Sequence, residues 1–299
     1  MRIFNGGLFS TFCDSRYAPF LTHFCLAAIV AIEFSLILWV PFWLMLPLCI
    51  VTHHRIGVLL HEYMHGIPCR KYSHNLAIFS LVNSIVLTFG ILEVFRGTHL
   101  AHHRWVNTPR DPGFWVARKG GPDKTLARVP WLIYRTFCGD HGFFLHLKYM
   151  LESFRGRHYY VRPKRVVLEI VLSAAWLSFW LLMGLPNVPL TLMLLHLCIV
   201  PPAAFRGAVE HSSHPGDPGF ANEYRVRLPI FNMNRHIHHH SDPTCPWYLL
   251  RFHTAQPLPA NHYWTHWFHL FVMRDYEFMR PMQEMTQPYR GIGEAHRQV

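Results

Sequence analysis

The sequence predicts an all-α integral membrane protein with about four transmembrane helices in two hairpins, one re-entrant or interfacial segment, and a cytosolic helical cap. Of its 299 residues, 51% are hydrophobic and only 15% are charged, which is well below the charged share of roughly 25% in soluble domains. The apolar residues also form runs as long as the roughly 20 residues that cross a bilayer. Lipid is therefore expected to surround much of the chain.

Prolines divide the long apolar runs into hairpins. The first run, residues 20–51, is too long for one helix and is interrupted at Pro41, so we predict spans near 20–40 and 41–60. Pro186 and Pro189 mark a turn and predict two further spans, near 166–185 and 188–205. Glu33 falls in the middle of the first span, where a carboxylate is costly and is often functional or paired inside the bundle. A protonated glutamate packed between helices is the alternative.

A further apolar segment, residues 76–95, lies between His65 and His99. A full crossing would place these two histidines on opposite sides of the membrane. If they share a metal site, the segment must instead be re-entrant or embedded at the interface. The polar sequence at about 97–165 and 207–299 is predicted to form the cap, and residues 1–299 to form a single domain.

The net charge of +11 indicates the orientation of the chain. Lys and Arg are concentrated between the predicted spans, as the positive-inside rule expects of cytoplasmic loops, so nucleic-acid binding is not needed to explain them. We expect both termini and the polar cap in the cytosol. Seven cysteines without a C-x-x-C pair predict reduced packing residues and no disulfide scaffold.

Histidine is the most unusual feature of the composition, with 24 residues in one chain. Many of them occur in groups whose i, i+3 and i+4 spacing places the imidazoles on one face of a helix. One such group would indicate little, but three groups, two of them with the same H-x-x-H-H spacing, strongly indicate a metal site. The groups are His61 with His65, His99 with His102 and His103, and His236 with His239 and His240.

Two metal ions are expected, because the donors are too many for one. His211, after Glu210 at the end of the last span, offers a ninth imidazole at the same membrane face, whereas His238 points to another side of its helix. Nine nitrogens suit two roughly six-coordinate ions that keep open positions. Imidazole binds Zn, Cu, Fe and Ni, but zinc cannot change redox state. Two irons are favoured, because they can bind and reduce O2 near inert hydrocarbon.

The three histidine groups resemble the histidine boxes of the membrane fatty acid desaturase and hydroxylase superfamily. They match in order and in position relative to the spans, so the resemblance covers nearly the whole chain. Asn107-Thr-Pro-Arg-Asp111-Pro and the segment from His240 to Arg251 also resemble sequences that follow the boxes in that superfamily. Glu210-His211 and the T-P-x-D-P string are similar to its alkane hydroxylase branch, whereas Pro-Trp-Tyr after the third box is equally typical of acyl desaturases.

The resemblance implies an O2-dependent di-iron oxidoreductase in the lipid bilayer, which desaturates or hydroxylates an unactivated C–H bond of a fatty-acyl or other lipid-like chain. It implies that the nine histidines are the ligands, with His211 as the isolated one. It also implies that nearby carboxylates orient ligating imidazoles through their second ring nitrogen. These carboxylates are Asp111, Glu210 and Asp242.

Electrons are expected from a separate carrier, either a ferredoxin, a rubredoxin or a haem protein with its reductase. His214-Pro-Gly-Asp-Pro-Gly resembles the haem-binding motif of a fused carrier domain, but too little sequence surrounds it for such a domain.

Two other classes of protein compete with this interpretation. His61-Glu62-Tyr-Met-His65 is also the H-E-x-x-H motif of zinc metalloproteases, in which the glutamate is the general base. An intramembrane zinc protease would leave both H-x-x-H-H groups unexplained. A metal carrier could use histidine-rich loops, but carriers more often place their ligands along a path within the spans.

Overall fold

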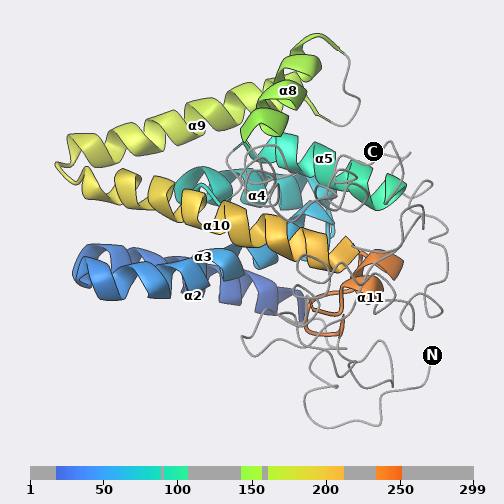
Figure 1. Ribbon diagram of the computed structural model, residues 1–299, viewed down its shortest axis with the longest axis horizontal. Coiled ribbons are helices and arrows are strands. Elements are labelled where there is room, and N and C mark those ends of the chain that lie inside the picture. The colour runs from blue at the N-terminus through green and yellow to red at the C-terminus, as the bar shows by residue number, and fades with distance from the viewer. Residues whose placement is uncertain (1–17, 89–90, 107–142, 157–160, 212–233, 251–299) are drawn as a thin grey trace, which may run out of the picture.

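The computed structural model (Figure 1) describes residues 18–88, 91–106, 143–156, 161–211 and 234–250. Every regular element in these ranges is a helix, which confirms the all-α prediction for the part of the chain that is described. Five cysteines in these ranges are free thiols, as expected, whereas Cys13 and Cys138 lie outside them.

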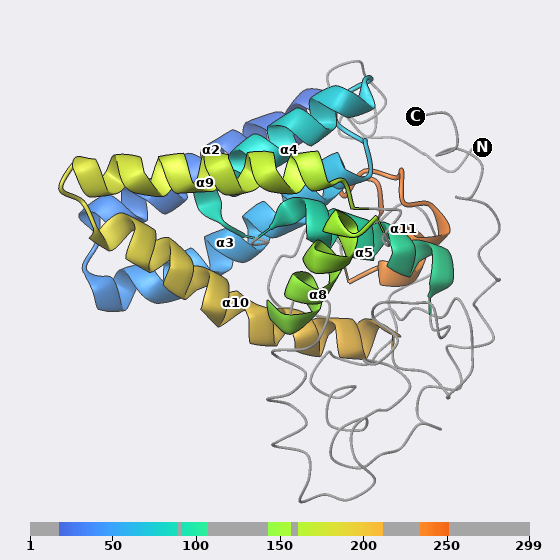
Figure 2. The same ribbon diagram turned by 90° about the horizontal axis from the view of Figure 1, so that it is seen from above.

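The first hairpin consists of α2 (Ala18–Trp39) and α3 (Phe42–Met64), which lie side by side in both views (Figures 1 and 2). Pro41 stands at the N-cap of α3, where its fixed φ suits the start of a helix but not the continuation of α2. Both helices are long and apolar enough to cross a membrane. Trp39 and Trp43 flank the turn and are largely exposed, as is common at membrane–water interfaces.

The second hairpin consists of α9 (Pro163–Leu182) and α10 (Asn187–His211), which are joined through Gly184 with a φ of +72°. Its turn lies at the same end of the molecule as the turn of the first hairpin (Figure 1). α9 is the third helix that can cross a membrane, whereas the apolar part of α10 covers only Asn187–Ile199. Three of the four predicted spans are therefore supported by length and composition, and the fourth stays a prediction.

The apolar segment between the first two histidine groups is broken into two helices. α4 (Tyr72–Val86) ends at Leu87, whose φ of +61° lies in the left-handed region that no α-helix of L-residues can continue through. α5 (Leu92–Trp105) then returns toward the end of the bundle where α3 finishes (Figures 1 and 2). This reversal brings His99 and His65 to the same end, as a shared site requires.

Two shorter helices lie at this end of the bundle. α8 (Phe143–Phe154) packs against α5 and α9, and α11 (His236–Ser241) carries the third histidine group. Most of the predicted cap lies outside the described residues, so the cap and the single-domain organisation stay predictions. A buried apolar core joins α2, α3 and α4 and extends to Leu92 and Phe95 of α5, and it supports the helices that carry the first two histidine groups.

Candidate metal centre

The first histidine group lies at the end of α3, where a glycine stops the helix. His61 is in the last turn and His65 is the C-cap. Gly66 has a φ of +77°, and its Cβ, if it had one, would meet the Tyr72 ring at 3.0 Å. Glycine is therefore required just after the first group, and the helix ends with both imidazoles buried.

Buried carboxylates anchor α5, which carries the second group. Glu169 on α9 accepts hydrogen bonds from the backbone N–H of Glu93 (2.8 Å) and from Ser80 Oγ on α4 (2.9 Å). Glu93 in turn forms a bidentate pair with Arg96, at 2.6 and 2.8 Å, and accepts a hydrogen bond from the backbone N–H of Arg162. These contacts fix the start of α5 against α4 and α9, and so fix the direction in which its histidines project.

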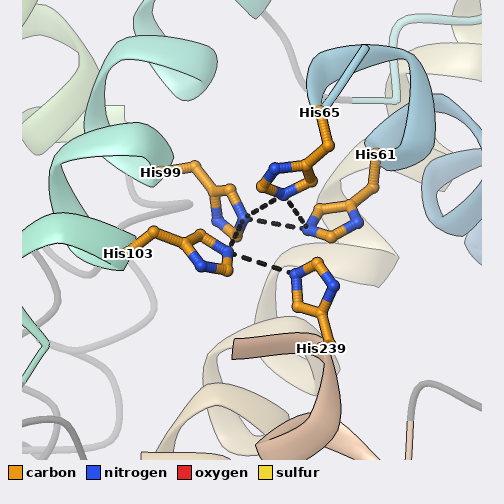
Figure 3. Close-up of side chains that lie close together, drawn as sticks. All are labelled: His61, His65, His99, His103 and His239. Atoms are coloured by element: carbon orange, nitrogen blue, oxygen red, sulfur yellow. Dashed lines mark hydrogen bonds between the residues drawn. The ribbon is translucent and has the colours of Figure 1, made fainter. Parts of the chain in front are cut away.

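Five imidazoles from three helices converge on one point (Figure 3). Their nitrogens all lie within 4.8 Å of one another, and they belong to His61, His65, His99, His103 and His239. Neighbouring Nε2 atoms are 2.8–3.3 Å apart. His61 and His239, which are 178 positions apart in the sequence, thus belong to the same cluster.

Hydrogen bonds among these rings cannot account for their arrangement. The Nε2 atom of His99 faces the Nε2 atoms of three neighbours, His61, His65 and His103, but a neutral imidazole nitrogen carries either one hydrogen or one lone pair. Because the Nε2 atoms of His61, His65 and His99 are mutual neighbours, at least two of them must face each other with like groups, either two hydrogens or two lone pairs. A cation between neutral rings that all offer lone pairs removes this repulsion. Ligands at right angles around an ion with metal–nitrogen bonds of about 2.1 Å lie about 3 Å apart, which fits the observed spacing.

The protonation state also suits metal binding. Burial, together with the neighbouring imidazoles, holds the pKa of His99 and that of His103 well below the usual value for histidine. Both rings are therefore neutral near pH 7, and a neutral ring is the form that offers a nitrogen lone pair to a metal.

A second group of imidazoles adjoins the cluster. His236 and His240 have their Nε2 atoms 3.0 Å apart, and His102 lies with its ring centroid 5.2 Å from that of His240. The ring of His240 stacks on that of His103 at 4.2 Å. Eight of the nine predicted ligands therefore gather in one region, with His103 at the junction of the two groups. His236, His239 and His240 are buried, whereas His238 is only half-buried.

The predicted carboxylates have different surroundings. Glu210 is buried, with one oxygen 2.7 Å from Arg206 Nε and the other 3.7 Å from His236 Nε2. It therefore faces the second group of imidazoles. Asp242 follows α11 and accepts hydrogen bonds from the backbone and the hydroxyl of Thr244, as in a turn. Asp111 and the side chain of His211 lie outside the described residues.

Glu62 has a role that sequence reasoning missed. Its carboxylate is buried, and it accepts hydrogen bonds from Thr22 Oγ1 at 3.0 Å and from the backbone N–H of Trp247 at 2.5 Å. Glu62 therefore links α2, α3 and the segment after the third histidine group. No local pattern in the sequence signals this contact, because Glu62 and Trp247 are 185 residues apart.

A comparison with protein families agrees with this site. The family model described as fatty acid desaturase matches residues 37–270, so the chain belongs to the fatty acid desaturase family. This confirms the resemblance of the histidine boxes. No match was found among curated proteins or among solved structures. The family and the apolar helices identify a membrane protein, and the family implies an oxidoreductase.

Proposed function

We propose that this protein is a membrane-bound, O2-dependent di-iron oxidoreductase that desaturates or hydroxylates an unactivated C–H bond of a fatty-acyl or other lipid-like chain. The observation that carries the proposal is the convergence of five imidazole nitrogens at the end of a bundle with three helices apolar enough to span a membrane. Two bound irons would supply the reduction of O2 and the oxidising power that a C–H bond requires.

The protein's own residues would hold the ions and set their positions. His61, His65, His99 and His239 would bind one ion, and His102, His236 and His240 the other, with His103 between them and His211 as the predicted ninth ligand. Glu210 is paired with Arg206, and its other carboxylate oxygen faces Nε2 of His236, the nitrogen that would bind the ion. Glu210 would therefore lie beside that ion and would not orient the ring through Nδ1. A separate electron carrier, either a ferredoxin, a rubredoxin or a haem protein with its reductase, would deliver the electrons.

The alternative of a zinc protease is not favoured, because Glu62, which would be its general base, already accepts hydrogen bonds within the protein. Both carboxylate oxygens of Glu62 accept hydrogen bonds within the protein, whereas a metalloprotease needs this group beside the metal-bound water. The cluster also holds imidazoles from all three boxes, which two histidines and one distant ligand would not require.

Purified protein is expected to contain about two irons per chain and little zinc, because the imidazoles exceed the capacity of one ion. Elemental analysis of protein purified from iron-supplemented cells measures this. One zinc per chain without iron would reject the oxidoreductase and favour the protease.

Product analysis tests the reaction itself. Enriched membranes are incubated with candidate lipids, a reductase system and isotopically labelled O2, and the products are analysed by mass. A labelled alcohol would indicate hydroxylation, and loss of two hydrogens without label would indicate desaturation. Iron-loaded membranes that consume O2 with none of the lipids would contradict the proposed substrate class.

We also propose that the histidine boxes and both termini face the cytosol. Single cysteines at the exposed positions Arg70 and Arg104 should react with an impermeant thiol reagent from the cytosolic side, because they flank the first two boxes. A cysteine at Met183, in the turn between α9 and α10, should react only from the other side. Labelling of positions 70 and 104 from opposite sides would mean that α4 and α5 cross the membrane and that the boxes form no common site.

A further inference from the structure

The Glu62 side chain connects three segments of the chain at the end of α3. It is buried, and its Oε1 atom accepts a hydrogen bond from the backbone N–H of Trp247 at 2.5 Å. Its Oε2 atom lies 3.0 Å from the Thr22 hydroxyl on α2. Both contacts can form whether or not the carboxyl group carries a proton, because a proton on Oε2 can be donated to the hydroxyl oxygen. Glu62 therefore holds the backbone at residue 247 in either state.

The backbone that Glu62 holds is attached directly to the third histidine box. Trp247 follows His240 by seven residues, and backbone hydrogen bonds close the chain between them into turns. The N–H of Asp242 donates to the carbonyl of His238 at 2.9 Å, and the N–H of Cys245 donates to the carbonyl of Asp242 at 3.0 Å. Because this link is short and hydrogen-bonded, a shift of residue 247 would move α11 and its three predicted ligands with it.

Apolar contacts also join this segment to the bundle. Cys245 and Leu250 pack with Val58, which lies one turn before Glu62 on the same face of α3. Apolar contacts are not directional, so they allow the segment to dock in more than one register. A hydrogen bond is restricted in both distance and angle. The bond between Glu62 and Trp247 therefore fixes where along α3 the segment docks.

We propose that Glu62 is a positioning residue for the third box. Its hydrogen bond to Trp247 sets the place of α11 against the first two boxes. The consequence for the metal rests on the proposed function, which assigns His236 and His240 to one ion, here called the second ion, and His239 to the other. Loss of the bond would displace two ligands of the second ion but only one ligand of the first, so the second ion depends on Glu62 more strongly.

Three variants separate the hydrogen bond from the charge and the volume of Glu62. Glu62→Gln keeps the shape of the side chain. Its amide oxygen can accept from Trp247 and its N–H can donate to the Thr22 hydroxyl, so this variant should keep the third box in place. Glu62→Met has a similar length but lacks both oxygens. Thr22→Val is the matched control, because it removes the other partner of the carboxyl group and leaves the bond to Trp247.

Hydrogen–deuterium exchange of the full-length, iron-loaded protein in detergent measures how firmly the third box is held. In Glu62→Met, the backbone amides of residues 236–250 should exchange roughly tenfold faster than in the wild type, as expected for the loss of one buried hydrogen bond. Glu62→Gln and Thr22→Val should keep the wild-type rates in this segment. Melting curves establish that each variant is folded.

Release of iron to a chelator tests the consequence for the metal. From reduced Glu62→Met, an excess of a ferrous-iron chelator should remove one iron per chain about ten times faster than from the wild type, because residues that orient ligands contribute roughly 10- to 100-fold to metal affinity. The other iron should leave more slowly, since only one of its proposed ligands lies on α11. A role in fold stability alone would release both irons in a single phase.

The proposal is overturned if Glu62→Met keeps the wild-type exchange rates at residues 236–250, if Thr22→Val raises them as much, or if Glu62→Met releases both irons in one phase. Loss of iron from Glu62→Gln to the same extent would also overturn it, because the charge of Glu62 and not its acceptor oxygen would then matter. Exchange is measured without turnover, so a failure to oxidise lipid, which would reject the proposed function, leaves the exchange result intact.

Discussion

Replacing His239 with Ala is expected to abolish lipid oxidation and to lower the bound iron. The His239 ring is buried, and its Nε2 atom lies 3.1 Å from that of His103, inside the cluster of five imidazoles. Loss of a residue that merely orients a ligand already costs 10- to 100-fold in metal affinity or activity. Loss of a ligand should therefore lower activity by at least about 100-fold, and iron content per chain measures the effect independently of any substrate.

His238→Ala is the matched control for this prediction, because it removes the same side chain one residue away. His238 is only half-buried and lies outside the imidazole cluster, since adjacent residues of α11 differ by about 100° around the helix. The variant should keep most of its iron and activity. If His238→Ala lost iron while His239→Ala kept it, α11 could not be helical through the box, and the ligand assignment there would be wrong.

Arg96→Met is expected to produce the largest loss of stability among substitutions outside the cluster. The variant leaves the Glu93 carboxylate buried without its bidentate partner, and breaking a buried ion pair in this way costs about 3–5 kcal/mol. Because Glu93 and Arg96 hold the first turns of α5, bound iron should fall as well. The free energy of unfolding in mixed detergent micelles and the iron content measure the two effects.

Two further variants test whether the loss of stability comes from breaking this ion pair or from removing a positive charge. Lys148→Met removes one partner of an exposed i,i+4 pair with a distance of 3.9 Å, and such pairs contribute less than about 1 kcal/mol. The double variant Glu93→Leu with Arg96→Met should recover much of the stability, because no buried charge stays unpaired. If Arg96→Met were no more destabilising than Lys148→Met, the conclusion that buried carboxylates anchor α5 would be wrong.

The sequence was most informative about features that the bilayer thickness or the repeat of the α-helix determines. Bilayer thickness and the prolines at positions 41 and 186 were enough to place the two hairpins close to where the helices begin and end. The i, i+3 and i+4 spacing likewise placed the imidazoles on common helical faces, and eight of the nine predicted ligands gather in one region. The metal identity and the ligand roles stay predictions, because geometry alone does not choose among metals that imidazole binds.

Contacts between distant segments could not be predicted in the same way. The break at Leu87 could not be placed from the sequence, because Gly90 lies three residues further on and an ordinary leucine adopts the left-handed conformation that ends α4. Nor could spacing show that Glu169 would reach the start of α5, or that Glu62 would bind the backbone of Trp247. Such contacts depend on how whole helices pack, and no local pattern in the chain encodes that packing.

Because the third box lies far along the sequence, it is synthesised well after the first two boxes. His239 follows His103, its neighbour in the cluster, by 136 residues, so at about 5–20 residues per second the ribosome makes it roughly 7–27 s later. For that interval the nascent chain offers an incomplete set of imidazoles, and Glu62 lacks its contact with Trp247. We therefore expect the set of imidazoles to be completed only once the third box has been made, after both hairpins have been synthesised. The metal that is available once the third box has been made would then decide which ion the site encloses.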